Sequence, residues 1–207
     1  MMQIDRIEAS KHKRGRVLVF LKDGSCLKIT EQELLDFGLR AGDEVDEEMR
    51  RRLRTAAGVS DTRAAAAELM GRRAMSRRDL ERKLQERGAS RTESRYAAEW
   101  MEAIGAINDA EYAAMLVRHC GQQGYGPGRV REKLREKGVP RELWEDALKQ
   151  LPPPEEQIEA FLNSKLHGEV PDVQQQKKLA AALARRGFGW SDVRAALSRW
   201  GAELPDE

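Results

Sequence analysis

Cysteine, histidine and aromatic residues are all scarce in this sequence of 207 residues. Its two cysteines, Cys26 and Cys120, are too few for a disulfide framework and lack the close spacing of a metal site. No run approaches the roughly eighteen apolar residues that a membrane-spanning helix needs, and no apolar signal segment follows Met1. We therefore expect a reduced, soluble, cytoplasmic protein that has no membrane partner.

The signatures of common catalytic sites are also missing. The sequence has no glycine-rich phosphate loop ending in Lys-Ser/Thr, no His-Glu-x-x-His and no Cys-x-x-Cys. Its three histidines, His12, His119 and His167, are far apart and have no convincing nucleophile or carboxylate nearby. We expect a protein that is not an enzyme and that uses neither a cofactor nor a metal.

The composition favours thin helical modules over one deep core. Aromatic residues make up only 5% of the chain and hydrophobic residues 40%, whereas charged residues make up 35%. Modules that each bury a narrow apolar stripe suit such a chain. The net charge is only +2, so bulk charge does not by itself indicate nucleic-acid binding.

The first 58 residues differ from the rest in predicting β-structure. Two β-prone runs, 17–21 and 26–29, flank Asp23-Gly24, a pair that supplies the positive φ angles of a tight hairpin turn. Thr30 and Glu33 then form a capping-box pattern that opens a short helix. We predict a small N-terminal extension that contains a β-hairpin.

From residue 59 onward the sequence is helical and repeats itself. SRRDLERKLQERGA, which begins at Ser76, is matched fifty residues later by GPGRVREKLREKGV, which begins at Gly126. A weaker third copy ends at Gly187, and a helix over 64–70, capped by Ser60 or Asp61, opens the first copy. We predict a mainly α protein built as an elongated, curved array of three three-helix modules, at 59–106, 107–151 and 155–203.

Basic residues concentrate on the second helices of the first two predicted modules. Between Arg72 and Arg95 the sequence has nine basic residues and four acidic ones. These residues form either a solvated helix face with i,i+4 pairs or a basic ridge that meets an anionic partner. Tyr125 is either a contact anchor in an exposed loop or a packing residue between modules. Three tryptophans lie at apolar spacing in the third helices and should belong to the core: Trp100, Trp144 and Trp200.

Three motifs together resemble the RecX family of recombination regulators. The first is Ser76-x-x-Asp-Leu-x-x-Lys-Leu-x-x-x-Gly88, the second is Ile107-Asn-Asp-x-x-Tyr-Ala113, and the third is Gly124-Tyr-Gly-Pro-x-Arg-Val130 with Leu134 and Lys137-Gly-Val139. The resemblance implies tandem three-helix modules that lie in the groove of the RecA–DNA filament. It also implies inhibition of the ATPase, strand-exchange and coprotease activities of RecA in the DNA-damage response.

Carried onto this sequence, the resemblance implies partner-binding residues on the second helices of the first two modules. The third module departs from the pattern, because alanines replace charges in its second helix. We expect a monomer whose N-terminal hairpin extends the footprint on the filament. The expected partner-binding residues are Tyr125, Arg129, Lys133 and Lys137, followed by Arg78, Arg82 and Lys83.

Other readings stay open from the residues alone. The chain could be a nucleic-acid-binding helical repeat protein that acts mainly through DNA, and a filament groove would also expose single-stranded DNA. A general helical adaptor for another protein is a further reading. A helix-turn-helix is disfavoured, because no module shows the Asn, Gln and Arg mixture that reads base edges.

Overall fold

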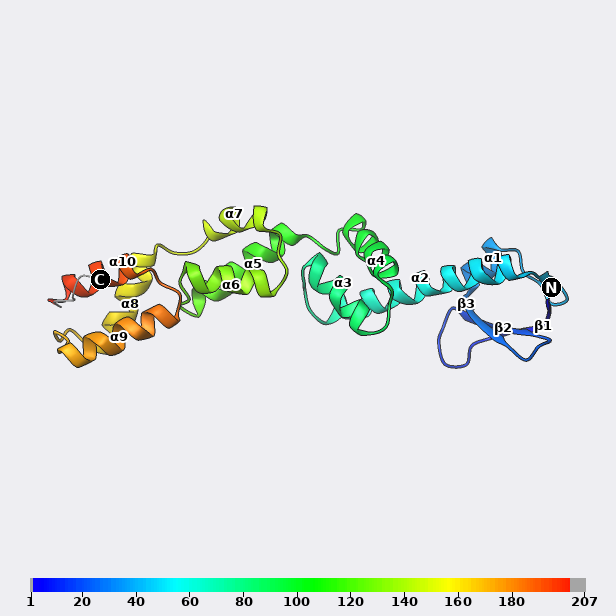
Figure 1. Cartoon of the computed structure of the whole chain (residues 1–207), viewed down its shortest axis with the longest axis horizontal. Coiled ribbons are helices and arrows are strands. Elements are labelled where there is room, and N and C mark those ends of the chain that lie inside the picture. Colours follow the sequence, from blue (N-terminus) through cyan, green and yellow to red (C-terminus); the bar gives the residue numbers. More distant parts are fainter. Residues whose placement is uncertain (1, 202–207) are drawn as a thin grey trace. The chain divides into compact units, whose positions relative to one another are not determined.

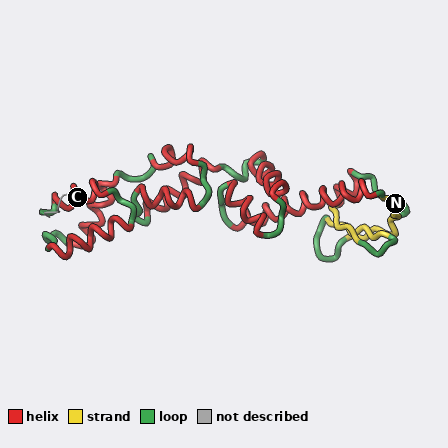
Figure 2. The backbone as a smooth tube through the Cα atoms, in the orientation of Figure 1, coloured by secondary structure: helices red, strands yellow, loops and turns green. Residues whose placement is uncertain are grey.

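The computed structural model describes residues 2–201 and divides the chain into two compact units. One unit comprises residues 1–73 and 80–106, and the other comprises residues 74–79 and 107–207. The described part contains ten α-helices and four strands, and the strands are confined to the N-terminal end of the sequence (Figures 1 and 2). The predicted mainly α fold with a small N-terminal sheet is confirmed. None of the described helices is both long and apolar enough to cross a bilayer.

The N-terminal sheet has four antiparallel strands in the order β3-β2-β1-β4. Strand β2 (Arg16–Leu21) and strand β3 (Cys26–Thr30) form the predicted hairpin, and Gly24 at its turn has a φ of +84°. Strands β1 (Met2–Ala9) and β4 (Glu44–Val45) were not predicted. Apolar and polar residues alternate in β1, but the alternation breaks at Asp5-Arg6, where the pairing with β2 is irregular, and only Ile4 is fully buried.

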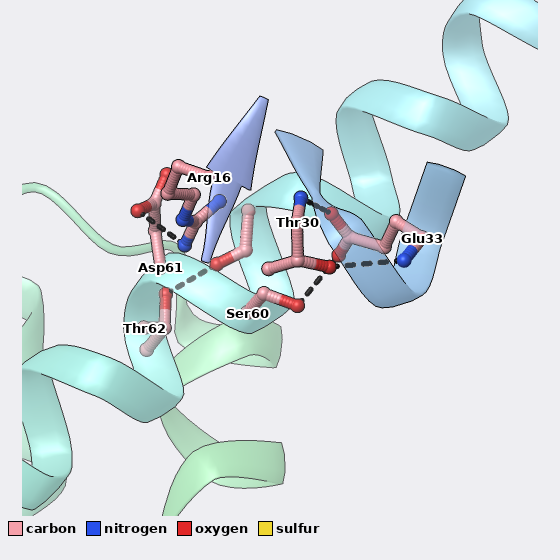
Figure 3. A network of polar contacts seen from close by, with 7 residues as sticks. Arg16, Thr30, Glu33, Ser60, Asp61 and Thr62 are labelled. Atoms are coloured by element: carbon pink, nitrogen blue, oxygen red, sulfur yellow. Dashed lines mark hydrogen bonds and ion pairs between the residues drawn. The ribbon is translucent and has the colours of Figure 1, made fainter. Parts of the chain in front are cut away.

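A network of polar side chains links this sheet to two helices, the short helix that follows β3 and the long helix that contains Ser60 and Asp61 (Figure 3). Thr30 caps helix α1 (Glu31–Asp36) in the predicted capping box with Glu33. The Glu33 carboxylate is buried and also accepts a hydrogen bond of 2.5 Å from the Ser60 hydroxyl. Next to it, Arg16 of β2 forms an ion pair with Asp61 at 2.7 Å. Sheet and helix are thus joined by hydrogen bonds as well as by apolar packing.

Helix α2 (Glu47–Arg72) is much longer than the helix predicted over 64–70. Its cap is Asp46, whose side chain accepts the Met49 N–H, so the predicted cap at Ser60 or Asp61 is wrong. The same helix buries Leu53 in the core of the sheet and Ala66 further along. The boundary proposed at residue 58 therefore lies within α2.

The two helices that follow α2 begin and end close to their sequence signals. Helix α3 (Arg77–Glu86) is followed by Gly88 with a φ of +96°, as its C-terminal glycine predicts. Helix α4 (Arg91–Ala103) begins with a capping box between Ser90 and Glu93. A side chain at Gly58 would overlap the Glu93 carboxylate, so this glycine lets α4 approach α2 closely.

The second unit contains two groups of three helices, each with its own core. Asn108 caps α5 (Asp109–Gln122), and Pro127 occupies the first turn of α6 (Pro127–Glu136), both as predicted. A short 3-10 turn (Arg141–Leu143) leads into α7 (Trp144–Leu148). Their core comprises Ala113, Val117, Cys120, Val130, Leu134, Val139, Trp144 and Ala147.

The last group consists of α8 (Pro154–Leu166), α9 (Val173–Arg185) and α10 (Trp190–Arg199). Helix α9 starts at the predicted Pro171-Asp172, and Asp172 forms a capping box with Gln175. The core of this group comprises Ile158, Leu162, Leu166, Ala180, Leu183, Phe188, Val193, Ala196 and Leu197.

The three tryptophans expected in the core differ in burial. Trp144 is buried, and its indole N–H donates a hydrogen bond of 2.9 Å to the Val139 carbonyl. Trp100 and Trp200 are only half-buried, and Trp200 packs against the core of the last helix group, so the prediction that they are core residues is confirmed only in part. Each lies near a charged side chain, with the Arg63 guanidinium 5.4 Å from the Trp100 ring centroid and the Trp200 indole N–H 2.9 Å from the Glu159 carboxylate. Their rings are amphipathic enough to pack at the edge of a core and still reach a polar partner.

The contacts of Glu159 predict a pH-dependent contribution to stability. Burial opposes its ionisation, but hydrogen bonds from Trp200 and Arg199 outweigh burial and hold the pKa of this carboxyl below its ordinary value. A carboxyl whose pKa is lowered by folding stabilises the protein above its unfolded pKa and loses that effect as the pH falls through the folded pKa. The free energy of unfolding of Glu159→Gln should therefore be lower than that of the natural chain at neutral pH. In urea titrations at several pH values this difference should shrink below pH 4.5, the ordinary value, and a pH-independent difference would contradict it.

Candidate partner-binding surface

Helix α6 carries the centre of the predicted partner-binding surface. Val130 and Leu134 are fully buried and fix which side of the helix faces its core. Arg129, Lys133 and Lys137 follow at intervals of four residues along an adjoining side, and all three are half-buried. We call these three residues the α6 basic face. The structure therefore aligns the three cations that the sequence placed on one ridge.

Two of these cations already have acidic partners on the same helix. Arg129 lies 2.5 Å from Glu132, and Lys133 lies 3.3 Å from Glu136. The hydrogen bond that Arg129 donates to Glu132 raises the pKa of Arg129 above its ordinary value, so this guanidinium stays charged. Within the part of the chain that the structure describes, Lys137 has no ion-pair partner. The α6 basic face therefore has features of both predicted interpretations. Two of its cations form intrahelical pairs, as on a solvated helix face, and the third is available to an anionic partner.

Tyr125 lies beside this face and packs within its own helix group. It is half-buried against the core of α5, α6 and α7, and its backbone N–H donates a hydrogen bond of 3.1 Å to the Cys120 carbonyl. It also makes a minor contribution to the raised pKa of Arg129. Of the two predicted roles, packing is the one that the structure supports, although the packing is within a module.

The cysteine thiol of this core is not a reactive group. Burial raises the pKa of Cys120, and the nearby charges of Lys133 and Arg129 only partly oppose that effect. A protonated, buried thiol is a poor nucleophile and a poor metal ligand. No cluster of His, Cys, Asp and Glu that could hold a metal ion is found among residues 2–201.

The predicted residues on α3 fall into different surroundings. Arg78 is exposed, and its side chain packs against Gly138 at the end of α6, which brings it to the α6 basic face. Arg82 forms an ion pair with Glu86 at 3.3 Å, and Lys83 is half-buried. Arg82 and Lys83 belong to the first unit, whereas Arg78 belongs to the second. The structure thus places Arg129, Lys133 and Lys137 on one side of α6, with Arg78 against Gly138 at its end and Tyr125 in the same helix group.

The basic residue and glycine that end α6 form a junction with the start of α3. The Ser76 hydroxyl donates a hydrogen bond to the Lys137 carbonyl, and the Arg77 N–H donates one of 2.8 Å to the Asp109 carboxylate. Gly138 has a φ of +69°, and a side chain there would press on Arg78. The repeated glycine therefore permits close approach as well as ending a helix.

The same junction recurs between α9 and the start of α6. Gly126 N–H donates a hydrogen bond of 2.8 Å to the Arg186 carbonyl, and Gly128 N–H donates one of 2.9 Å to the Gly187 carbonyl. The Arg186 guanidinium lies 4.8 Å from the Phe161 ring centroid and bonds backbone carbonyls of the preceding loop. The N–H groups of Gly126 and Gly128 at the start of α6 are thus occupied by the segment that ends α9 and are not available to a ligand.

These junctions give the repeated motif a structural function that the sequence analysis missed. The motif occurs more than once because the second helices of successive modules pack end to start. The end of α6 contacts the start of α3, and the end of α9 contacts the start of α6. The available signal was Gly126 and Gly128, which flank Pro127 at a helix start where side-chain caps are commoner. Glycine at both positions indicates that another backbone approaches closely.

Comparison with known proteins gives consistent similarities. A family profile described as "RecX, second three-helix domain" matches residues 108–148, which cover α5 to α7. The protein named regulatory protein RecX of Pseudomonas tolaasii is 32% identical over 146 residues, covering 70% of this chain and 93% of its own length. The protein of the same name from Levilactobacillus brevis is 30% identical over 196 residues, covering 91% of this chain and 72% of its own length. A crystal structure of regulatory protein RecX shares the fold, with a TM-score of 0.73, 24% identity, and coverage of 96% of this chain and 100% of that chain.

Proposed function

This chain belongs to the RecX family of regulatory proteins, and from that premise we propose that it regulates the RecA recombinase. It binds the RecA–DNA filament in the cytoplasm as a monomer and lowers ATP hydrolysis, strand exchange and the coprotease activity that triggers the damage response. It acts by binding and catalyses no reaction itself.

The α6 basic face is the observation that supports this proposal most directly. Arg129, Lys133 and Lys137 are aligned on a helix whose other side is fixed by a buried core, so their positions are set before a partner arrives. Arg78 adds a further cation beside Gly138, the residue after Lys137. Preorganised cations of this kind favour an acidic protein surface, because little conformational entropy is lost on binding.

Repetition of the helical modules adds to the same proposal. A filament presents the same surface on every subunit, so a chain with several similar modules can engage several subunits at once. Linked contacts raise the overall affinity without requiring a strong single contact. The α3 residues Arg82 and Lys83 supply the corresponding charges of the first module.

The experiment that tests the proposal is a titration of this protein into RecA hydrolysing ATP on single-stranded DNA. Binding of the protein to the same DNA without RecA is measured alongside. Inhibition at concentrations well below those that bind naked DNA is the expected result. Inhibition only where the protein already covers the DNA would favour the alternative function, a DNA-binding helical repeat protein.

A further inference from the structure

The loop between β1 and β2 carries a cluster of positive charge that the proposed function does not use. Within Ser10–Gly15, the side chains of Lys11, Lys13 and Arg14 are exposed and have no ion-pair partner in the described residues. The Ser10 hydroxyl accepts hydrogen bonds from the backbone N–H groups of His12 at 3.4 Å and Lys13 at 3.3 Å. The loop therefore holds a turn that presents its cations to solvent.

A cavity of about 730 Å³ lies beside this loop, within the first unit. Its walls come from the loop, strands β2 and β3, the middle of α2, and the turn between α3 and α4. Leu18, Ala65 and Leu84 supply apolar wall. The cationic lining residues are Lys13, Arg16, Lys28 and Arg87, with His12 beside them.

The acidic residues near the cavity are already engaged. Asp61 is paired with Arg16, and the Glu93 carboxylate accepts the Ser90 N–H at 2.8 Å. Arg16 nevertheless keeps a buried Nη1 group with no hydrogen-bond partner. Because Asp61 is its only acidic partner among the described residues, the Arg16 guanidinium also contributes positive charge to the cavity wall, and this charge favours an anionic ligand.

The repeated junction explains why this cavity exists. At the ends of α6 and α9, Gly138 and Gly187 are covered by the start of another helix. At the end of α3 the corresponding Gly88 has open space around its Cβ position, and the turn formed by Arg87 and Gly88 lines the cavity instead. The position after the second helix is thus open in the first module, whereas the start of another helix covers it at Gly138 and Gly187.

We propose that the β1–β2 loop and this cavity bind the phosphodiester backbone of a single-stranded nucleic acid, with one nucleotide in the cavity. The volume lies within the range of small-ligand pockets, roughly 300–1,000 Å³. Phosphates meet Lys11, Lys13 and Arg14 at the rim, while the apolar wall takes the sugar or base. A single strand fits better than a duplex, because a paired nucleotide enters a pocket only after it is unstacked and unpaired.

The test uses the full chain and a fluorescently labelled oligothymidylate, without RecA, followed by anisotropy. One variant carries Lys11→Glu, Lys13→Glu and Arg14→Glu. The matched control carries Lys165→Glu, Lys177→Glu and Lys178→Glu, three exposed lysines of the second unit without ion pairs in the described chain. Both variants change the net charge equally, and circular dichroism verifies that both are folded.

The loop variant should bind the oligonucleotide at least about tenfold more weakly than the control variant. Its affinity should also depend less on salt. The slope of the logarithm of the binding constant against the logarithm of the salt concentration should become less negative by about 0.7 for each phosphate that the loop no longer neutralises. Equal weakening in both variants, or no binding by the natural chain, would overturn the proposal. Free thymidine monophosphate should compete only weakly at matched ionic strength, because it can fill the cavity but makes fewer contacts with the loop cations than a strand does. Displacement by the monophosphate at concentrations comparable with the strand would assign the cavity to a free nucleotide and overturn the proposal.

This test is independent of the proposed regulation of RecA. The oligonucleotide assay contains no RecA, and the loop lies in a different unit from the α6 basic face. A failure here leaves inhibition of RecA ATP hydrolysis unaffected, whereas a failure of that inhibition leaves binding of the strand to be measured separately.

Discussion

Replacing Lys133 and Lys137 with glutamate is expected to raise the concentration needed for half-inhibition of RecA ATP hydrolysis by about tenfold or more. Each residue lies on the α6 basic face, where reversal turns an attraction into a repulsion. A tenfold change corresponds to about 1.4 kcal/mol, which is within the range for a few central interface residues. Arg129 is left unchanged, because its backbone lies against Gly187 and a defect there could reflect the junction.

The matched control for this variant is Lys177→Glu with Lys178→Glu on α9. Both lysines are exposed, and the change in net charge is the same. Glutamate at 133 removes the pair with Glu136 and places like charges one turn apart, which costs only about 0.2–0.5 kcal/mol in a helix. Helical circular dichroism should therefore be retained. Full inhibition by the α6 variant, or an equal defect in the control, would show that the face is only solvated surface.

The elements that could be predicted from sequence are those set by local chemistry. The turn at Asp23-Gly24 and the caps at Thr30 and Asn108 each depend on residues within a few positions of one another. Strand β4 has only two residues, and the alternation in β1 breaks at Asp5-Arg6, so neither strand could be identified without its pairing to a distant segment. The length of helix α2 was underestimated because its sequence is mostly polar. Its few buried residues pack against two different elements, the sheet and α4.

The candidate site divides in the same way. Helical spacing was enough to place Arg129, Lys133 and Lys137 on one side of α6, because a buried stripe orients the helix. The intrahelical partners Glu132 and Glu136 also follow from spacing. The junctions did not follow, because they join segments about sixty residues apart through backbone groups that every residue possesses. Only the pairing of glycine at both a helix start and a helix end pointed to them.

Replacing Gly187 with alanine is expected to be among the most destabilising single changes in the second unit. Gly187 has a φ of +87°, and its Cβ would collide with the backbone of Arg129. The strain of a left-handed alanine costs about 1–2 kcal/mol. Separation of the two segments would also weaken the hydrogen bonds of Gly126 and Gly128, each worth about 0.5–1.5 kcal/mol. The total corresponds to a fall in the melting temperature of several degrees, at about 2–4 °C per kcal/mol for a chain of this size.

Gly168→Ala separates the collision from the backbone strain. Gly168 also has a left-handed φ, +90°, but nothing lies within 4 Å of its Cβ position. It should therefore suffer only the strain, and its unfolding free energy in urea should exceed that of Gly187→Ala by about 2 kcal/mol, the value of the hydrogen bonds at the junction. Hydrogen exchange of the Gly126 and Gly128 amides should accelerate in Gly187→Ala alone, because only that variant parts α9 from the start of α6. Equal destabilisation of the two variants, with both amides still protected, would mean that the repeated glycine serves only to end a helix and that the modules are coupled by other contacts.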